Sequence, residues 1–225
     1  MPVRPFFSLS PQVVSSLIII TALSIFFIIM GRKISKVKPT ETPKGLLFLV
    51  VFLTEMFIGM VKPYMPGKRF AIYAPYLFSI FIYLAFANTV ALFGLMAPLS
   101  NIGVAMSFTL ITFVMLKFTE LKFIGLKQKL KNVFLGHVWQ LFPIMLPINL
   151  IGEISTPMTM GIRLFGNLVS GAVISAFVYA VAGAFFGIFA GVLLHSIFDV
   201  FFGLIQAFVF FMLSMVNLSM ASDAS

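Results

Sequence analysis

Long apolar runs separated by short polar segments dominate this sequence. The first run covers residues 13–30, and a helix of roughly 20 residues can cross about 30 Å of hydrocarbon. Two runs at 70–96 and 104–116 follow, joined by an uncharged turn that contains Pro98 and Asn101. Two more runs, at 140–180 and 186–217, are interrupted by few charged residues. The pattern predicts five transmembrane helices, and the last two are expected to be the longest.

The run at residues 45–62 is shorter and carries Glu55. It follows Pro43 and ends in the Lys62-Pro63 step. We interpret it as a helix lying at the membrane interface, and a further span is the alternative. The longest polar segment covers only residues 31–45, which is too short for a domain outside the membrane. The sequence therefore predicts an all-α integral membrane protein, with residues 1–225 in a single membrane domain.

Composition and charge add a topology to this prediction. Hydrophobic residues make up 61% of the chain and charged residues 9%, against about 25% charged in ordinary globular domains. The net charge of +9 could indicate nucleic-acid binding, but most basic residues form three clusters between apolar runs, as cytoplasmic loops do. The clusters are Arg32, Lys33, Lys36, Lys38 and Lys44; Lys62, Lys68 and Arg69; and Lys117, Lys122, Lys127, Lys129 and Lys131.

The charge pattern places the N-terminus outside and the C-terminus in the cytoplasm. The first run is expected to be a retained helix rather than a signal peptide, because the basic residues follow it. A lipid bilayer is the expected surrounding, and no nucleic-acid partner is expected. The chain has no cysteine and two distant histidines, so neither a cofactor nor a metal site is expected. Motifs of metalloproteases, phosphate-binding loops and serine hydrolases are absent from the sequence, and the chain is not expected to be catalytic alone.

Ionisable and amide side chains interrupt the last two runs. Inserting a central arginine costs about 2.5–3.5 kcal/mol on translocon scales, so such residues are candidates for function. The ionisable candidates are Glu153, Arg163, His195 and Asp199, accompanied by Asn149, Asn167, Ser170, Gln206 and Asn217. On a wheel of about 100° per residue, Asn149, Thr156, Thr159, Gly166, Asn167 and Ser170 lie within about 60° of Arg163. Asp199, Gln206 and Asn217 lie within about 40° of His195.

Two polar stripes of membrane length have two interpretations. They can be polar glue between helices, with Arg163 and Asp199 as a structural ion pair. They can also line a hydrated path, or two half-paths, for an ion. The second stripe extends over about 33 Å of helix, which is the thickness of the hydrocarbon core. Its length favours a transport role.

The residues around Arg163 resemble a family signature. The segment Pro157-Met-Thr-Met-Gly-Ile-Arg-Leu-Phe-Gly-Asn167 is similar to the signature of subunit a of F-type ATP synthases. Leu204-Ile-Gln-Ala-Phe208, Met212-Leu-Ser-Met-Val216 and Phe86-Ala-Asn88 continue the likeness. The resemblance implies a stator subunit with two offset half-channels for protons or sodium ions. Its implied partners are a rotating ring of c subunits, peripheral-stalk b subunits and the remaining synthase subunits. The last two helices would then be tilted and would wrap the ring.

The resemblance also implies roles for individual residues. Arg163 would face the ion-binding carboxylate of each ring subunit, with Gln206 and Asn167 beside it. At about 4 Å and an effective dielectric of 20, such a pair is worth about 4 kcal/mol, which is enough to expel a bound ion. Arginine keeps its charge when desolvated, which lysine need not do. The small Gly166 and Ser170 would allow a ring helix to approach.

Three positions depart from the family pattern. Ala172 and Asn149 stand where many members have glutamate, and Asp199 stands where many have histidine. The access path is therefore expected to run through Asp199 and His195, with Glu153 a weaker candidate. A stand-alone ion channel or transporter and a structural scaffold remain alternatives. A bacterial plasma (inner) membrane is the expected location.

Overall fold

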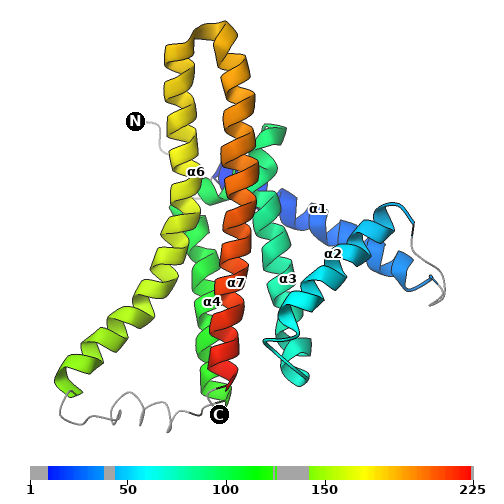
Figure 1. Cartoon of the computed structure of the whole chain (residues 1–225), viewed down its shortest axis with the longest axis vertical. Helices are drawn as coiled ribbons and strands as arrows, with labels where there is room; N and C mark the ends of the chain where they lie inside the picture. The colour runs from blue at the N-terminus through cyan, green and yellow to red at the C-terminus, as the bar shows by residue number, and fades with distance from the viewer. Residues whose placement is uncertain (1–9, 38–43, 124, 126–141, 224–225) are drawn as a thin grey trace.

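Helices make up almost all of the described part of the chain (Figure 1). The computed structural model describes residues 10–37, 44–123, 125 and 142–223, with residues 142–147, 149–150, 182–188 and 222–223 described by their backbone alone. No strand occurs among these residues. Five helical segments are long and apolar enough to cross a membrane: Pro11–Ile34, Lys68–Phe93, Ile102–Phe123, Ile151–Val181 and Phe189–Ala221. The predicted all-α membrane fold with five spans is confirmed.

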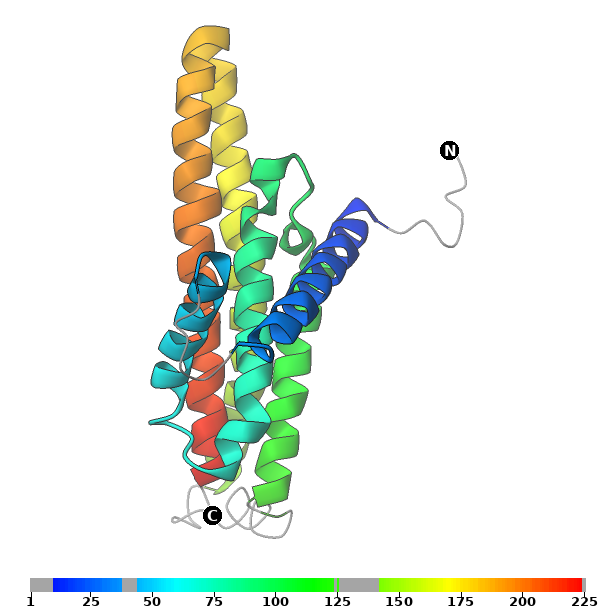
Figure 2. The same cartoon turned by 90° about the vertical axis from the view of Figure 1, so that its right-hand side faces the viewer.

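The two N-terminal helices lie on the outside of the bundle. Helix α1 (Pro11–Ile34) begins with proline in its first turn and ends with Arg32 and Lys33, both favourable positions for a helix. It slants across the other helices (Figure 2) and is joined to α3 by a 2.7 Å hydrogen bond between the hydroxyls of Ser16 and Tyr83. Helix α2 (Leu46–Val61) has 16 residues and is too short to count as a span. Its position at the membrane interface stays a prediction.

A helical hairpin follows. Helix α3 (Lys68–Thr89) continues into the 3-10 turn η1 (Val90–Phe93), and a second turn, η2 (Pro98–Ser100), leads into α4 (Ile102–Phe123). Helix α4 extends beyond the predicted end at residue 116. Lys117 and Glu120 form an i,i+3 ion pair in this extension, which adds about 0.2–0.5 kcal/mol to the stability of the helix. Lys117 and Lys122 are therefore helical rather than in a loop. Lys38, Lys127, Lys129 and Lys131 lie outside the described residues.

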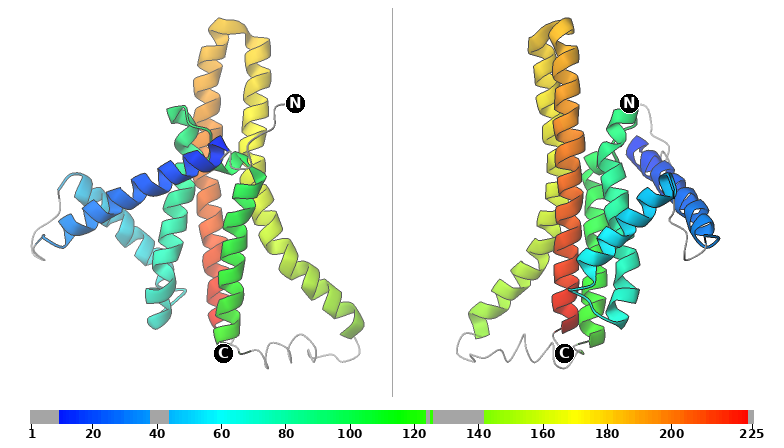
Figure 3. Two further views of the ribbon diagram at one scale, coloured as in Figure 1. Left: turned by 180° about the vertical axis from the view of Figure 1, so that it is seen from behind. Right: turned by 45° about the vertical axis from the view of Figure 1, so that its right-hand side comes forward.

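The last part of the chain forms two long antiparallel arms. Helix α6 (Phe142–His195) reverses direction part of the way along, and the π-helix η4 (Ser196–Phe202) and helix α7 (Gly203–Asp223) continue the returning arm (Figures 1 and 3). We call residues 151–181 the first arm and residues 189–221 the second arm. Figure 3 shows the start of α6 leaning away from the bundle. Asn149 lies on this segment, but its side chain is outside the described part.

Glycines allow the two arms to touch. A Cβ atom on Gly171 would lie 3.0 Å from the Cβ of Phe198, and one on Gly191 would collide with the hydroxyl of Tyr179. Close backbone approach at small residues is the usual way in which helices associate in lipid. These two contacts also fix the register of the arms, because they identify which residues lie opposite each other.

The core lies where α3, α4 and the two arms meet. Leu84, Leu99, Leu164 and Phe210 are almost fully buried in one cluster. Phe57, Leu77, Phe211 and Met215 belong to a second cluster nearer the end where α4 and α7 finish. Because Met160, Leu164 and Leu168 of the first arm are buried in this core, the intervening Arg163 lies on the exposed side of the helix.

Candidate functional site

Arg163 lies on the exposed side of the first arm. Its guanidinium has no hydrogen-bond or ion-pair partner among the residues that the structure describes. The internal Arg163–Asp199 pair, considered above as a structural alternative, is not formed, because Asp199 pairs with His195 instead. A cation at membrane depth is costly unless it is paired or hydrated. The position of Arg163 therefore suits a partner that approaches from outside the chain.

The surroundings of Arg163 are small and polar. Asn167 lies one turn further along and is half-buried, and its Nδ2 atom is buried without a hydrogen-bond partner in the described part of the chain. Ser170 is exposed. A Cβ atom on Gly166 would meet no atom of the described residues within 4 Å, in contrast with Gly171 and Gly191. Packing in the described part of the chain therefore does not require glycine at position 166.

The register of the arms places Gln206 opposite Arg163. Gly171 contacts Phe198, and Arg163 lies eight residues before Gly171 while Gln206 lies eight residues after Phe198. Since the arms are antiparallel, these equal steps bring Arg163 and Gln206 to the same height. Gln206 is half-buried. By the same register, Ser170 lies at the height of Asp199, and Glu153 lies near the height of Asn217.

His195 and Asp199 form a hydrogen-bonded pair on the second arm. The Nδ1 atom of His195 lies 2.6 Å from Oδ2 of Asp199, and their side chains are 43% and 13% exposed. Asp199 lies within the π-helix that begins directly after His195. Imidazole and carboxylate are side-chain groups that commonly act as general acids and bases. This pair is therefore a candidate for proton transfer on the second arm.

The π-helix changes the predicted stripe of the second arm. The wheel used above assumed about 100° per residue throughout, but an i→i+5 segment contains about one extra residue and rotates the next part of the helix by about 100°. His195 and Asp199 therefore do not share one face with Gln206 and Asn217. In agreement, Asn217 lines a pocket against α4 and the first arm. The second arm carries two polar faces, one on each side of the π-helix.

Helix α3 supports the π-helix at its end. Asn88 is 1% exposed, and its Nδ2 donates a 2.9 Å hydrogen bond to the main-chain oxygen of Gly203. A Cβ atom on Gly203 would lie 2.7 Å from the Cβ of Asn88. The glycine is therefore required by this approach. Asn88 belongs to one of the motifs in the sequence, but its contact with Gly203 could not be inferred from that motif.

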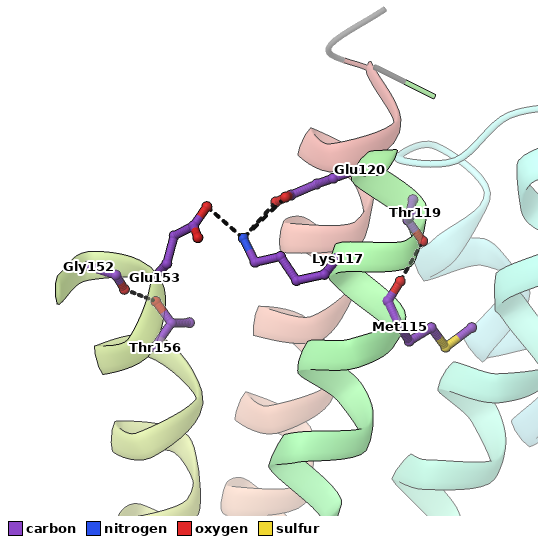
Figure 4. A network of polar contacts seen from close by, with 7 residues as sticks. All are labelled: Met115, Lys117, Thr119, Glu120, Gly152, Glu153 and Thr156. Atoms are coloured by element: carbon purple, nitrogen blue, oxygen red, sulfur yellow. Dashed lines mark hydrogen bonds and ion pairs between the residues drawn. The ribbon is translucent and has the colours of Figure 1, made fainter. Parts of the chain in front are cut away.

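An ion network joins α4 to the first arm at the end of the bundle that carries Lys68, Arg69 and Lys122, which we call the basic end. Lys117 Nζ lies 2.8 Å from Glu153 Oε1 and 3.1 Å from Glu120 Oε2, so that the ammonium lies between two carboxylates (Figure 4). Glu153, predicted as a weaker candidate for the ion path, thus has a partner on α4. Sequence reasoning missed Lys117, because it was assigned to a loop.

The comparisons with known proteins agree with the signature around Arg163. The family described as ATP synthase A chain matches residues 13–219. ATP synthase subunit a 2 of Chlorobium luteolum is 29% identical over 96% of this chain, and ATP synthase subunit a of Chlorobium phaeobacteroides is also 29% identical over 96% of it. This chain spans 65% of the length of each of these two relatives.

A third relative is covered more completely. ATP synthase subunit a of Desulfosudis oleivorans is 28% identical over 91% of this chain and is itself covered to 85%. The family match includes all five candidate spans except the first residues of one and the last residues of another. On this match, the chain belongs to the ATP synthase A chain family.

Proposed function

We propose that this chain is the ion-conducting stator subunit of an F-type ATP synthase. The proposal rests on Arg163, whose side chain is exposed and has no hydrogen-bond or ion-pair partner in the described part of the chain. A ring of c subunits with ion-binding carboxylates supplies the missing partner. Asn167 and Gln206 provide amide groups near the same height, and a Cβ atom on Gly166, three residues after Arg163, would meet no described atom within 4 Å.

The order of polar groups along the arms supports two offset half-channels. His195, Asp199 and Ser170 lie on the side of Arg163 towards the reversal of the chain. Glu153, Thr156 and Asn217 lie on the side towards the basic end. In this proposal, each group belongs to the half-channel that opens on its own side of the membrane, and Arg163 stands between the two groups. A fixed positive charge at this place repels cations, and it therefore prevents direct leakage between the half-channels.

The proposed orientation of the chain in the membrane is based on the position of the basic end. Cytoplasmic segments are rich in lysine and arginine, so the basic end is placed in the cytoplasm of a bacterial plasma membrane. This orientation puts the C-terminus inside and the N-terminus outside. Helix α2 then lies at the inner interface. The peripheral-stalk b subunits and the remaining synthase subunits are the further partners.

Substitution of Arg163 tests the proposal. In membrane vesicles that contain the whole synthase, Arg163→Ala is expected to abolish ion-driven ATP synthesis, while the soluble head still hydrolyses ATP. Arg163→Lys should restore little, because a desolvated lysine can lose its proton. Full coupled synthesis in Arg163→Ala would contradict the proposal. Purification gives a second test, because a stand-alone channel or transporter would be active without a ring, whereas a stator subunit should co-purify with one.

A further inference from the structure

Helix α2 carries one charged side chain in an otherwise apolar sequence. Among its 16 residues, only Thr54, Glu55 and Gly59 lack an apolar side chain. The hydroxyl of Thr54 donates to the main-chain oxygen of Val50, so it needs no other partner. Glu55 is exposed and forms no hydrogen bond or ion pair with any residue that the structure describes. Its carboxylate is therefore left without a counter-charge from this part of the chain.

The opposite face of α2 holds the helix against the bundle. Val50, Phe57 and Val61 are buried there, and the ring centroid of Phe57 lies 4.6 Å from that of Phe211 on α7. At about 100° per residue, Phe57 lies about 160° from Glu55 around the helix. Figure 1 shows α2 at the edge of the bundle. Glu55 therefore lies on the side of α2 that faces away from the bundle.

The face around Glu55 is apolar. Phe48 and Phe52 lie within about 60° of it on the helix, they are 56% and 54% exposed, and 6.2 Å separates the centroids of their stacked rings. Lys62 lies about two turns further on the same side and forms no ion pair with Glu55. A helix on a membrane surface normally carries its charges on a polar face, and a carboxylate in hydrocarbon is costly unless it is paired. A protein surface that supplies a cation suits this face better than water or lipid tails.

Gly59 gives a second helix room to approach. It lies one turn after Glu55, and a Cβ atom on it would meet none of the described atoms within 4 Å. Small residues are the usual places where helices approach each other closely in lipid. The rings of Phe48 and Phe52 can attract a lysine or arginine through cation–π contacts. A second copy of this chain fits less well, because a symmetric contact would bring one Glu55 towards the other.

We propose that Phe48, Phe52, Glu55 and Gly59 form the binding surface for a helix of a neighbouring membrane subunit, and that this helix carries a lysine or arginine opposite Glu55. We call these four residues the α2 surface. The inference rests on the proposed function only in that the chain is assembled with other subunits of a synthase. It does not involve Arg163 or the path of the ion.

Photocross-linking in the whole synthase tests the α2 surface. p-Benzoylphenylalanine in place of Phe52 is expected to link this chain to another subunit, at a segment with a lysine or arginine within about one helical turn. Glu55→Lys should lower the yield of this link roughly tenfold, because like charges then meet, and Glu55→Gln should lower it less. Thr54→Val is the matched control and should keep the full yield, since Thr54 bonds only its own helix. Exchanging the basic residue of the linked segment for glutamate should restore the link in Glu55→Lys.

Links to phospholipid alone would show that lipid covers the α2 surface and would overturn the inference. Links only to a second copy of this chain, or an unchanged yield in Glu55→Lys, would overturn it as well. Failure of the proposed function would look different. In that case Arg163→Ala would keep ion-driven ATP synthesis, while the link from position 52 would still form.

Discussion

The side-chain amide of Asn88 donates a 2.9 Å hydrogen bond to the main-chain oxygen of Gly203, across the contact between α3 and the start of α7. This bond fixes the end of the π-helix that carries Asp199. Asn88→Leu should therefore disturb the His195–Asp199 pair and destabilise the protein by about 0.5–1.5 kcal/mol, because a buried hydrogen bond between two helices is lost while the carbonyl keeps its bond within α7. Thermal unfolding in detergent measures the change in stability.

Gly203, which accepts this hydrogen bond, should be as sensitive to substitution as Asn88, but for a steric reason. Gly203→Ala places a methyl group 2.7 Å from the Cβ of Asn88, and overpacking of this kind typically costs about 1–3 kcal/mol. Combining Gly203→Ala with Asn88→Gly removes the opposing Cβ and should recover part of the loss. Strict additivity of the two substitutions would contradict the close approach.

Asp199 and Glu153 should differ in importance for ion access. Asp199 is hydrogen-bonded to His195, whereas Glu153 is one of two carboxylates around Lys117. Asp199→Asn should therefore impair proton-driven ATP synthesis more than Glu153→Gln does. Initial rates of synthesis in vesicles measure both. The reverse ranking would refute the placement of the outer path at Asp199.

The arrangement common in the family, with glutamate at position 172 and histidine at position 199, should be compatible with this fold. Ala172 directly follows Gly171, and Asp199 directly follows Phe198, so the contact between Gly171 and Phe198 places positions 172 and 199 on the same side of the paired arms. Asp199→His alone removes the carboxylate and should be strongly impaired. Adding Ala172→Glu returns a carboxylate beside the new histidine and should restore part of the synthesis rate. Ala172→Gln in the same background is the control, since it has the shape without the charge.

Substitution of Lys117 should destabilise the protein more than substitution of either of its carboxylate partners. In Lys117→Gln, the carboxylates of Glu120 and Glu153 face each other without the ammonium, whereas Glu153→Gln leaves Lys117 paired with Glu120. Because Lys117 and Glu153 are 21% and 40% exposed, the loss in Lys117→Gln should be about 1–3 kcal/mol rather than that of a fully buried pair. A double-mutant cycle with Lys117→Gln and Glu153→Gln, followed by thermal unfolding, measures the coupling. A cycle without coupling would show that the contact is energetically neutral.

ATP synthesis in membrane vesicles can show whether protons or sodium ions drive the enzyme. A hydrogen-bonded imidazole and carboxylate suit a path for protons, whereas a sodium path is expected to rely on oxygen ligands that need not titrate. A proton gradient should therefore drive synthesis without sodium. If only a sodium gradient drives synthesis, His195 and Asp199 serve the path in another way.

Hydropathy predicted the spans, and a short signature singled out Arg163 as a candidate, because both depend on the identity of residues along one helix. The sequence could not predict the π-helix, since a residue inserted into a helical turn leaves no periodic mark of its own. His195 and Gln206 were therefore assigned to one face. The Lys117–Glu153 pair was missed because helix α4 was predicted to end at residue 116, before the lysine. Such contacts depend on how distant helices meet.

Gly166 has a practical consequence for chemical labelling. The chain contains no cysteine, so Gly166→Cys would introduce a single thiol at a place where a Cβ meets no atom of the described residues within 4 Å. A thiol at this place reports on whatever passes the face of Arg163. Disulfide trapping with a cysteine on a neighbouring subunit would then identify that neighbour and stop its movement, and reduction would release it again.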